Sequence, residues 1–438
     1  MSEYELMKDS GIEWVGEIPR HWSIIANKYV MHKVKEICES WEGQDVLSLT
    51  MKGVIVRDLI NPTGKMPTTF DGYQRVTCGD LLMCLFDIDV TPRCVGRAYN
   101  KGVISPAYTR FQLTKLADLN YYYYYYLMID NTKELLHLAK NLRHSFTEEQ
   151  LGVLKVPLPP ISEQKAIGVF LDKSCSDIDT AIAEAKASIE DYKLLKQSII
   201  TKAVTKGLNP TVPMKDSGVE WIGIIPENWD VKPLKRVITD RSGGAWGEDS
   251  KHDDNDRICM RIADFDFDRG VFKDKSIEDL TIRNYPQHQI NSLTLKKGDI
   301  VVEKSGGGEK TPVGRAVLFD KDYLALYANF TDRIRVDSNV VFPKFMEYWW
   351  RTMYFKTTTT KYIKQTTGIQ NLDISSLLRN EKICLPSKED QQQIVFQLDF
   401  ITGQIDNLIT EKAAMIADLE AYKKSLIYEV VTGKRKVC

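Results

Sequence analysis

The sequence lacks the signals that would place the protein in a membrane or outside the cell. No stretch approaches the roughly 18 consecutive apolar residues that a membrane helix needs. The first residues, Met1 to Glu5, have neither the basic region nor the apolar region of a signal peptide. These two absences predict a cytoplasmic protein.

Metal-binding patterns are also missing. The 8 cysteines include no Cys-x-x-Cys pair, and the 6 histidines do not pair with them at metal-ligand spacing. We therefore expect reduced thiols and no metal site in this chain.

The chain has no excess of either charge. Its 59 Lys and Arg residues are balanced by 60 Asp and Glu residues, for a formal net charge of -1. A protein that grips DNA unaided usually carries a basic excess, because its cations release counterions from the phosphates. Any DNA-binding face must therefore be local, or partners must contribute to the binding.

What the chain does have is an internal repeat. MKDSGIEWVGEIPRHW begins at Met7, and MKDSGVEWIGIIPENW begins 207 residues later at Met214. LPPISEQKAIGVFLDKSCSDIDTAI begins at Leu158, and LPSKEDQQQIVFQLDFITGQIDNLI begins 227 residues later at Leu385. The sequences between these motifs diverge strongly. The repeat predicts two halves that share one fold but carry different surfaces.

A long helix is predicted after each of the second motifs. Apolar residues recur alternately every four and three residues, which is the heptad pattern of a coiled coil. A helix from about Glu163 to Lys206 would be on the order of 65 Å long, more than a globular lobe needs. Two such helices are therefore expected to pack on each other, through a seam of Leu171, Ile178, Ile182, Ile189, Tyr192 and Ile199 in the first helix and Leu398, Ile405, Ile409, Ile416, Leu419 and Leu426 in the second.

Two lysines interrupt the seam at matching positions of the repeat. Lys196 and Lys423 lie 227 residues apart. A polar residue in a seam can fix the register of two helices at some cost in stability. Alternatively, the long side chain reaches out of the seam to solvent. The sequence leaves both interpretations open.

The divergent portions are predicted to be mixed α/β lobes. Strand-like apolar runs occur at 45–50, 81–86, 298–302 and 316–319. Helical stretches follow Asp118 and Pro343. Six consecutive tyrosines, Tyr121 to Tyr126, and the pair Trp349 and Trp350 lie in these stretches. Base stacking is one use of such aromatics, but packing inside a lobe is favoured because both runs occupy corresponding places before a long helix.

The repeated openings "DSG-EW-G-IP--W" and the repeated helix starts "LP---EQ--I---LD----ID--I" resemble those of type I restriction-modification specificity subunits. The resemblance covers essentially the whole chain. It implies an α/β protein with two mixed α/β target-recognition domains, separated by two long antiparallel coiled-coil helices, in a pseudo-two-fold repeat. The implied boundaries are 1–158 for the first recognition domain, 159–207 for the first long helix, 208–385 for the linker and second recognition domain, and 386–438 for the second long helix.

The same resemblance implies the partners. They are double-stranded DNA with an asymmetric, bipartite site, two methyltransferase subunits, and restriction or translocase subunits, with no membrane. S-adenosylmethionine is expected in the methyltransferase partner, and ATP and magnesium in the restriction partner. No cofactor and no catalytic residue are expected in this chain.

Catalytic motifs are missing from the sequence. An adenine methyltransferase would carry Asn-Pro-Pro-aromatic, but Asn61-Pro62 and Asn209-Pro210 are each followed by Thr. The glycines at 306–308 suggest a phosphate loop only superficially, because Glu309 stands where a glycine should precede Lys310. A self-contained restriction or modification enzyme is therefore disfavoured. A coiled-coil interaction protein without DNA binding remains an alternative because of the net charge.

Basic and amide side chains in the divergent portions are the candidate DNA contacts. Arginine can pair with guanine, amides can pair with adenine, and small residues in a loop let a DNA backbone approach. Any single candidate is more often a phosphate contact or a solvated surface group than a base reader. Arg97 and Arg315 share a Gly-Arg-Ala context, which favours a common structural or backbone role. The candidates are Gln74, Arg93, Arg97, Lys101 and Arg110 in the first lobe, and Arg241, Lys304, Gly307, Lys310, Arg315, Asn329 and Arg333 in the second.

Overall fold

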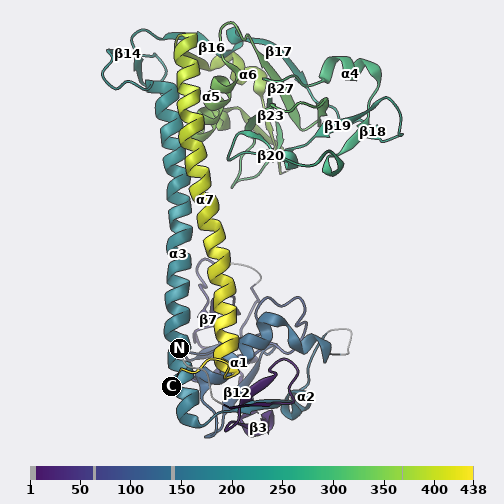
Figure 1. Ribbon diagram of the computed structural model, residues 1–438, viewed down its shortest axis with the longest axis vertical. Coiled ribbons are helices and arrows are strands. Elements are labelled where there is room, and N and C mark those ends of the chain that lie inside the picture. Colours follow the sequence, from purple (N-terminus) through teal and green to yellow (C-terminus); the bar gives the residue numbers. More distant parts are fainter. Residues whose placement is uncertain (1–5, 63–65, 140–143, 367, 438) are drawn as a thin grey trace. The chain divides into compact units, whose positions relative to one another are not determined.

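The computed structural model describes residues 6–62, 66–139, 144–366 and 368–437, and Figure 1 traces the chain. It divides into two compact units. The first comprises Met1–Lys186 with Ala413–Cys438, and the second comprises Ala187–Lys412. We call residues 6–160 the first lobe and residues 207–387 the second lobe. Each lobe has a mixed α/β fold, as the sequence predicted.

The first lobe is built from short antiparallel sheets. A four-stranded sheet has the order β10-β9-β12-β4, and a three-stranded sheet has the order β11-β8-β5. The strands β1 and β2, β3 and β13, and β6 and β7 form separate pairs. The strand bounds are β1 (Met7–Asp9), β2 (Glu17–Pro19), β3 (Ser23–Ala26), β4 (Met31–Val34), β5 (Ile37–Cys38), β6 (Leu47–Thr50), β7 (Gly53–Val56), β8 (Tyr73–Val76), β9 (Leu81–Met83), β10 (Val95–Arg97), β11 (Gly102–Ile104), β12 (Thr109–Leu113) and β13 (Lys155–Leu158). The helices of this lobe are α1 (Leu119–Thr132) and α2 (Glu148–Val153).

The second lobe has larger sheets of mixed direction. Its six-stranded sheet has the order β17-β27-β23-β25-β21-β20, its four-stranded sheet the order β18-β22-β19-β26, and its three-stranded sheet the order β24-β29-β28. Parallel pairs join β19 to β26 and β21 to β25. The strand bounds are β14 (Met214–Asp216), β15 (Ile224–Pro226), β16 (Asp230–Pro233), β17 (Ile238–Gly243), β18 (Glu248–Asp249), β19 (Asp256–Met260), β20 (Phe265–Asp266), β21 (Val271–Phe272), β22 (Ile282–Asn284), β23 (Ile300–Glu303), β24 (Ser305–Gly306), β25 (Ala316–Leu318), β26 (Ala325–Tyr327), β27 (Thr331–Val336), β28 (Ile363–Thr366), β29 (Ile369–Leu372) and β30 (Lys382–Leu385). The helices are α4 (Gln287–Leu293), α5 (Pro343–Phe355) and α6 (Ile374–Asn380).

The strand and helix predictions for the lobes are confirmed in position. The four apolar runs become β6, β9, β23 and β25, each shorter than its run, and the helical stretches become α1 and α5. Apolar composition marks the buried strands, but it does not show where main-chain pairing ends. In most cases the paired strand therefore begins or ends one to three residues inside the predicted apolar run.

The tyrosine run of α1 is packed inside the first lobe. Tyr121, Tyr122, Tyr124, Tyr125 and Tyr126 are all buried, and neighbouring rings meet edge to face, the geometry that aromatic quadrupoles favour. Their burial leaves no room for a nucleic-acid base.

The tryptophan pair of α5 is buried in the same way in the second lobe. Neither Trp349 nor Trp350 has solvent-exposed surface. The indole N–H of Trp350 donates to the carbonyl of Gly314 at 2.8 Å. The packing interpretation is therefore confirmed for both aromatic runs.

The two long helices are α3 (Ile161–Lys206) and α7 (Lys388–Val431). Within the first unit, Leu171 and Ile178 of α3 share a core with Leu426 and Val430 of α7. Within the second unit, residues near the end of α3 share a core with residues near the start of α7. The start of each helix thus meets the end of the other, and the helices are antiparallel in both units (Figure 1).

Burial along the seam drifts away from the strict heptad. Leu171, Ile178 and Ile182 are buried as predicted, whereas Ile199 is only half-buried and its neighbour Ile200 is fully buried. A straight α-helix has about 3.6 residues per turn and slips by roughly 20° per heptad against a 3.5-residue repeat. The contact line therefore moves by about one position over the length of α3. The predicted seam residues that stay half-buried are Ile189, Tyr192, Ile199, Ile409, Ile416 and Leu419.

Candidate nucleic-acid interface

A glutamine at the start of each long helix holds the adjoining lobe. In the first unit, Gln164 is fully buried. Its Oε1 accepts from the main-chain N–H of Asp118 at 2.8 Å. Its Nε2 donates to the carbonyls of Leu116 at 3.0 Å and Pro159 at 2.8 Å. Since Asp118 is the N-cap of α1, the Gln164 side chain on α3 fixes the point at which α1 begins.

The second unit repeats this clamp with equivalent atoms. Gln391 accepts from the N–H of Phe342, the N-cap of α5, at 2.7 Å. It donates to the carbonyls of Val340 and Pro386, both at 3.1 Å. Leaving such buried groups unpaired costs about 1–3 kcal/mol each. We call each of these arrangements a glutamine clamp.

A tyrosine–aspartate hydrogen bond reinforces each clamp. The hydroxyl of Tyr124 on α1 donates to Asp172 of α3 at 2.9 Å. The hydroxyl of Tyr348 on α5 donates to Asp399 of α7 at 2.5 Å. Asp172 and Asp399 are the aspartates of the repeated "LD" in the helix-start motif. Each lobe helix is therefore tied to its long helix at two places.

The repeated "ID" aspartates join the long helices to each other. Asp179 of α3 accepts from Lys423 of α7 at 2.6 and 2.7 Å, and Asp406 of α7 accepts from Lys196 of α3 at 2.5 Å. Lys196 is 5% exposed, so it does not extend out of the seam to solvent. The lysine side chain of Lys423 is 25% exposed. Both lysines make cross-helix ion pairs, which favours the register-fixing interpretation.

Several segments of the second lobe that the sequence singled out come together. The N–H groups of Lys304 and Ser305 donate to the carbonyl of Phe330 at 2.9 and 3.2 Å. Gly243 at the end of β17 pairs with Asp332 of β27, and Gly306 of β24 pairs with Gln370 of β29. We call the surface formed by Arg241, Gly243, Lys304, 306–308, Lys310 and Asn329 the loop face.

One buried carboxylate organises the cations of the loop face. Asp332 is 1% exposed. It pairs with Arg241 at 2.6 Å and with Lys304 at 2.8 Å. Glu309, Lys310 and Asn329 are exposed. Arg241 and Lys304 beside the single carboxylate of Asp332 leave one excess positive charge, so this part of the loop face is locally basic in a nearly neutral chain.

The glycines of the loop face expose main chain rather than bind a nucleotide. Gly306 and Gly307 have φ of +118° and +61°, and a Cβ on Gly307 would lie 2.8 Å from the N of Val313. A Cβ on Gly308 would meet nothing within 4 Å, so a ligand backbone has room to approach there. A phosphate loop opens into a helix, whereas this loop leads to β25.

Three predicted DNA contacts are corrected by their burial. Gln74, Arg110 and Arg333 are 4%, 2% and 3% exposed. Arg110 pairs with buried Asp80 at 2.5 Å, and Arg333 pairs with Asp240. Releasing Arg110 to a phosphate would strand the buried carboxylate of Asp80, which is strongly unfavourable. The side chain of Asp240 is 45% exposed, so Arg333 is removed from the DNA contacts by its own burial. Their roles are structural.

Arg97 and Arg315 also have internal partners. Arg97 pairs with Asp172 of α3. Burial by itself lowers the pKa of Arg97, but the hydrogen bond and charge of Asp172 outweigh burial and raise the pKa. Arg315 forms two bonds to Glu303, at 2.9 and 3.0 Å, under the ring of Phe267. The shared structural role inferred from their common context fits these contacts.

The remaining first-lobe candidates do not form a second loop face. Arg93 is half-buried, with its Nε 4.0 Å from Asp130, whereas Lys101 is exposed. Phe330 was not among the residues selected from the sequence. Its carbonyl accepts from the N–H groups of Lys304 and Ser305, and the residue is 54% exposed. Its only signal was a turn-like Asn-Phe-Thr-Asp run between two strands.

Among the described residues, no three His, Cys, Asp or Glu side chains are grouped as a metal site would require. None of the described helices is both long enough and apolar enough to cross a membrane.

Two lobes clamped in the same way to one pair of antiparallel helices define an internally repeated, two-lobed scaffold. The family model for the type I restriction modification DNA specificity domain matches residues 95–190 and 226–416. The chain belongs to this family.

Similar proteins agree with this assignment. The type I restriction enzyme MjaVIII specificity subunit of Methanocaldococcus jannaschii is 32% identical over 288 residues, which are 65% of this chain and 63% of that protein. The EcoBI specificity subunit of Escherichia coli is 23% identical over 288 residues, 64% of this chain and 58% of that protein. The alignments thus span less than two thirds of these relatives.

Two solved structures share the fold. One chain, from work on complex assembly and conformational transition of the type I R-M system, has a TM-score of 0.69 at 15% identity and covers 94% of this chain and 98% of its own length. The HsdS subunit of Thermoanaerobacter tengcongensis has a TM-score of 0.52 at 15% identity, with 95% and 98% covered.

Loss of a glutamine clamp should destabilise the second unit. Gln391→Ala leaves the N–H of Phe342 and the carbonyl of Val340 without their side-chain partner. We expect the free energy of unfolding to fall by about 2–6 kcal/mol, from two buried groups at about 1–3 kcal/mol each. Urea denaturation followed by circular dichroism measures the change. Gln392→Ala, at the exposed neighbouring position, should change it by less than about 0.5 kcal/mol; equal effects of the two substitutions would contradict the clamp.

Proposed function

We propose that this chain is the DNA sequence-specificity subunit of a type I restriction-modification complex. Each lobe reads one half of an asymmetric, bipartite site, and the two long helices hold the lobes apart and carry the partner subunits. The observation that carries the proposal is the duplication itself: the same clamps attach two lobes whose exposed surfaces differ. Relatives named as specificity subunits support it.

The division of labour along the chain follows from this proposal. Residues 1–158 and 208–385, the latter including the linker, are the two recognition domains. Residues 159–207 and 386–438 are the two spacer helices. The glutamine clamps bond to main-chain atoms of the lobes, so they place no demand on lobe sequence at those points. This arrangement suits recognition domains that diverge while their attachment is retained.

We assign the chemistry to the partners rather than to this chain. Methyl transfer needs S-adenosylmethionine in a methyltransferase subunit, and cleavage needs ATP and magnesium in a restriction subunit. The absence of an Asn-Pro-Pro-aromatic motif and the strand that follows the glycine loop support this assignment. Such a complex would work on DNA in the cytoplasm.

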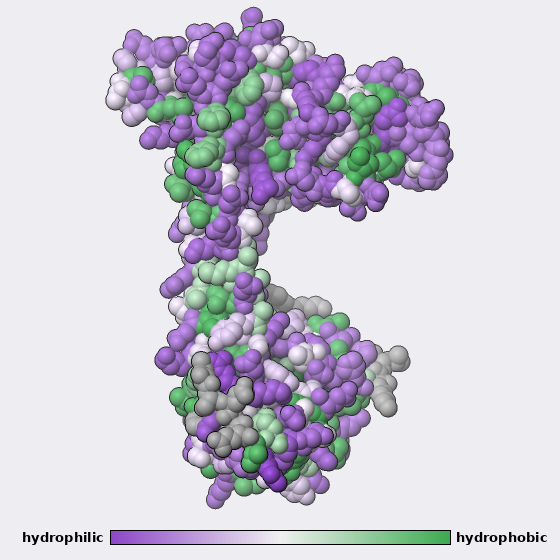
Figure 2. Space-filling model, viewed as in Figure 1, coloured by the Kyte–Doolittle hydropathy of each residue, from purple (hydrophilic) through white to green (hydrophobic). Residues whose placement is uncertain are grey.

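Exposed aromatic residues on α7 offer a docking surface for a methyltransferase subunit. Phe396 and Phe400 are 77% and 61% exposed, although the chain's surface is otherwise largely hydrophilic on the face shown in Figure 2. Residues four apart lie on one face of a helix. Because Leu398 between them is buried in the unit core, the phenylalanines point away from that core. Large aromatics held in this way are typical anchors of protein interfaces.

Exchange of the second lobe tests the proposal. Replacing Lys235 to Asn380 with the matching part of another family member retains the pairing of β16 with β30 and the whole of α7. We expect one half-site of the methylated sequence to change and the other to stay, because only one reading surface is replaced. Methylome sequencing of cells that contain the hybrid complex measures this outcome. A change in both half-sites would show that the lobes are not independent readers.

Removal of a loop-face cation should weaken DNA binding without changing the sequence read. Lys310→Ala removes one expected phosphate contact, so affinity should fall similarly for target and non-target duplexes. The slope of log K against log salt should decrease by about 1. Fluorescence anisotropy of the reconstituted complex at several salt concentrations gives both quantities. Lys297→Ala, another exposed lysine of the second lobe, is the control; an equal loss there would remove the loop face from consideration.

Replacement of the α7 phenylalanines should release the methyltransferase subunit. Phe396→Ser with Phe400→Ser removes the apolar anchors, and the affinity for that subunit should fall at least about tenfold, since each buried interface aromatic is worth roughly 2 kcal/mol or more. Co-purification and calorimetry measure the loss. Gln397→Ser, at an exposed position between them, should retain the partner. Retention by the double variant would place the docking surface elsewhere.

A further inference from the structure

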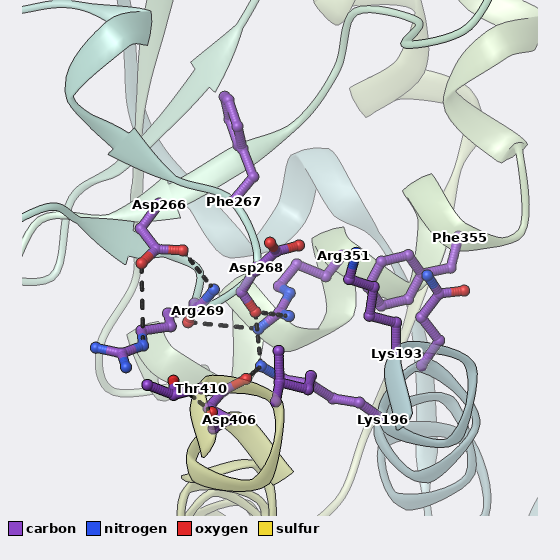
Figure 3. Close-up of a pocket in the computed structure, with 12 residues that line it drawn as sticks. Lys193, Lys196, Asp266, Phe267, Asp268, Arg269, Arg351, Phe355, Asp406 and Thr410 are labelled. Carbon is purple, nitrogen blue, oxygen red and sulfur yellow. Dashed lines mark hydrogen bonds and ion pairs between the residues drawn. The ribbon is translucent and has the colours of Figure 1, made fainter. Parts of the chain in front are cut away.

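A loop of the second lobe meets both long helices at one buried point. The loop comprises residues 266–270 and runs from the last residue of β20 to the residue before β21. It borders a cavity of about 290 Å³ that side chains of α3, α5 and α7 also line. Figure 3 shows Lys196, Arg351 and Asp406 converging on this loop from those three helices. All of these residues belong to the second unit.

Lys196 links three separate elements. Its ammonium donates to Asp406 of α7 at 2.5 Å and to the main-chain carbonyl of Asp268 at 2.7 Å. Burial lowers the pKa of Lys196, and the hydrogen bond to Asp406 offsets only part of that effect. Replacing a buried ion pair by apolar residues is often neutral for stability. The Lys196–Asp406 pair is therefore better explained by the arrangement of helices and loop that it specifies than by a contribution to the free energy of unfolding.

The loop is also fixed to its own lobe. Arg351 of α5 donates to the carbonyl of Asp268 at 2.7 Å, so that single carbonyl accepts from two cationic side chains. Gly270 has a φ of +70°, and a Cβ there would lie 1.9 Å from Oε1 of buried Glu347. Only glycine lets the loop lie this close to α5. The loop is therefore seated against α5 at Gly270 and hydrogen-bonded to it through Arg351 while it holds Lys196.

The repeat supplies a natural comparison for Lys196. Lys423 and Asp179 occupy the positions equivalent to Lys196 and Asp406, 227 residues away in each case. The hydrogen bonds recorded for Lys423 within the described residues both go to Asp179. Lys423 thus joins the helices only, whereas Lys196 joins the helices and a lobe loop.

We propose that Lys196 is a positioning residue that fastens the second lobe to both long helices and thereby sets the half-site spacing that the complex accepts. The fastening is a property of the second unit by itself. Its consequence for spacing rests on the proposed function. A lobe that is held by the clamps alone can rock about α5, so its loop face would meet DNA over a wider range of positions.

Hydrogen exchange on the full-length chain tests the fastening without DNA. Lys196→Met combined with Asp406→Leu replaces the ion pair by apolar residues, so no uncompensated charge is left buried and folding is retained. The amide of Gly270, bonded to Asp266 at 2.8 Å, should exchange about tenfold faster or more, as expected for loss of a hydrogen bond to a charged group. The matched pair Lys423→Met with Asp179→Leu should leave that exchange rate unchanged. Equal rates at Gly270 in wild type and both variants would overturn the proposal.

The single substitution Lys196→Met checks the same point with Asp406 retained. Circular dichroism and the thermal midpoint establish that each variant is folded. If the single variant does not fold, the double variant still decides, because the donor to Asp268 is lost in both. Faster exchange in the double variant throughout the second lobe, rather than at the loop, would indicate general loosening and would contradict a local fastening.

Spacing is measured with the reconstituted methyltransferase complex on duplexes whose gap is one base pair shorter, equal to, or one longer than the native gap. Wild type should methylate the native gap much faster than the others. The double variant at Lys196 and Asp406 should reduce that ratio at least about threefold while both half-site sequences are retained. It should reduce the ratio further than the Lys423 pair, which removes a cross-helix ion pair but leaves the lobe loop fastened. An unchanged ratio alongside faster exchange at Gly270 would overturn the link to spacing. Failure of the wild-type complex to methylate any duplex would instead reject the proposed function, and the exchange experiment would still stand.

Discussion

The buried glutamine amide at the start of each long helix is the interaction on which the placement of each lobe depends. Gln164 and Gln391 satisfy main-chain groups that precede α1 and α5, which would otherwise be buried without partners. Because both clamps bond to main chain, the lobe sequence around them is free to change. The helix-start motif is retained in both halves while the lobe interiors diverge. The contacts described above explain three of its polar positions, namely the glutamine and the aspartates of "LD" and "ID".

Internal ion pairing determines which cations are left for the proposed contact with DNA. Arg110 neutralises a carboxylate inside its lobe, Arg333 is buried beside the partly exposed Asp240, and Arg97 is committed to a long helix. These three arginines are therefore withdrawn from DNA contact in a chain whose net charge is -1. The loop face concentrates some of the other cations, since Asp332 holds Arg241 and Lys304 together at the cost of neutralising one. A small basic surface of this kind gives a modest salt-dependent attraction, which is consistent with a scaffold that shares DNA binding with partners.

Local patterns in the sequence predicted the local structure. The heptads and the repeat were sufficient for the long helices, and the aromatic runs were correctly interpreted as packing. The errors concern pairs distant in sequence: Arg333 and Asp240 are brought together by the pairing of β17 with β27, which no periodicity reveals. The role of Gln164 had a signal, its place in a repeated motif, but its partners are main-chain atoms that precede α1 and α3 and carry no side-chain signature.

The repeat is more symmetric in sequence than in its contacts. Lys196 and Lys423 are equivalent, yet within the described residues a hydrogen bond to a lobe carbonyl is made by Lys196 and not by Lys423. The first lobe instead reaches its long helix through Arg97 and Asp172. The helices therefore supply common attachment points, and each lobe supplies its own third contact. A transplanted second lobe would bring its own 266–270 loop to a Lys196 and Asp406 that stay behind on α3 and α7. If that loop lacks a correctly placed carbonyl, Lys196 retains only its cross-helix partner, as Lys423 does, and the hybrid reads its new half-site from a less firmly held lobe.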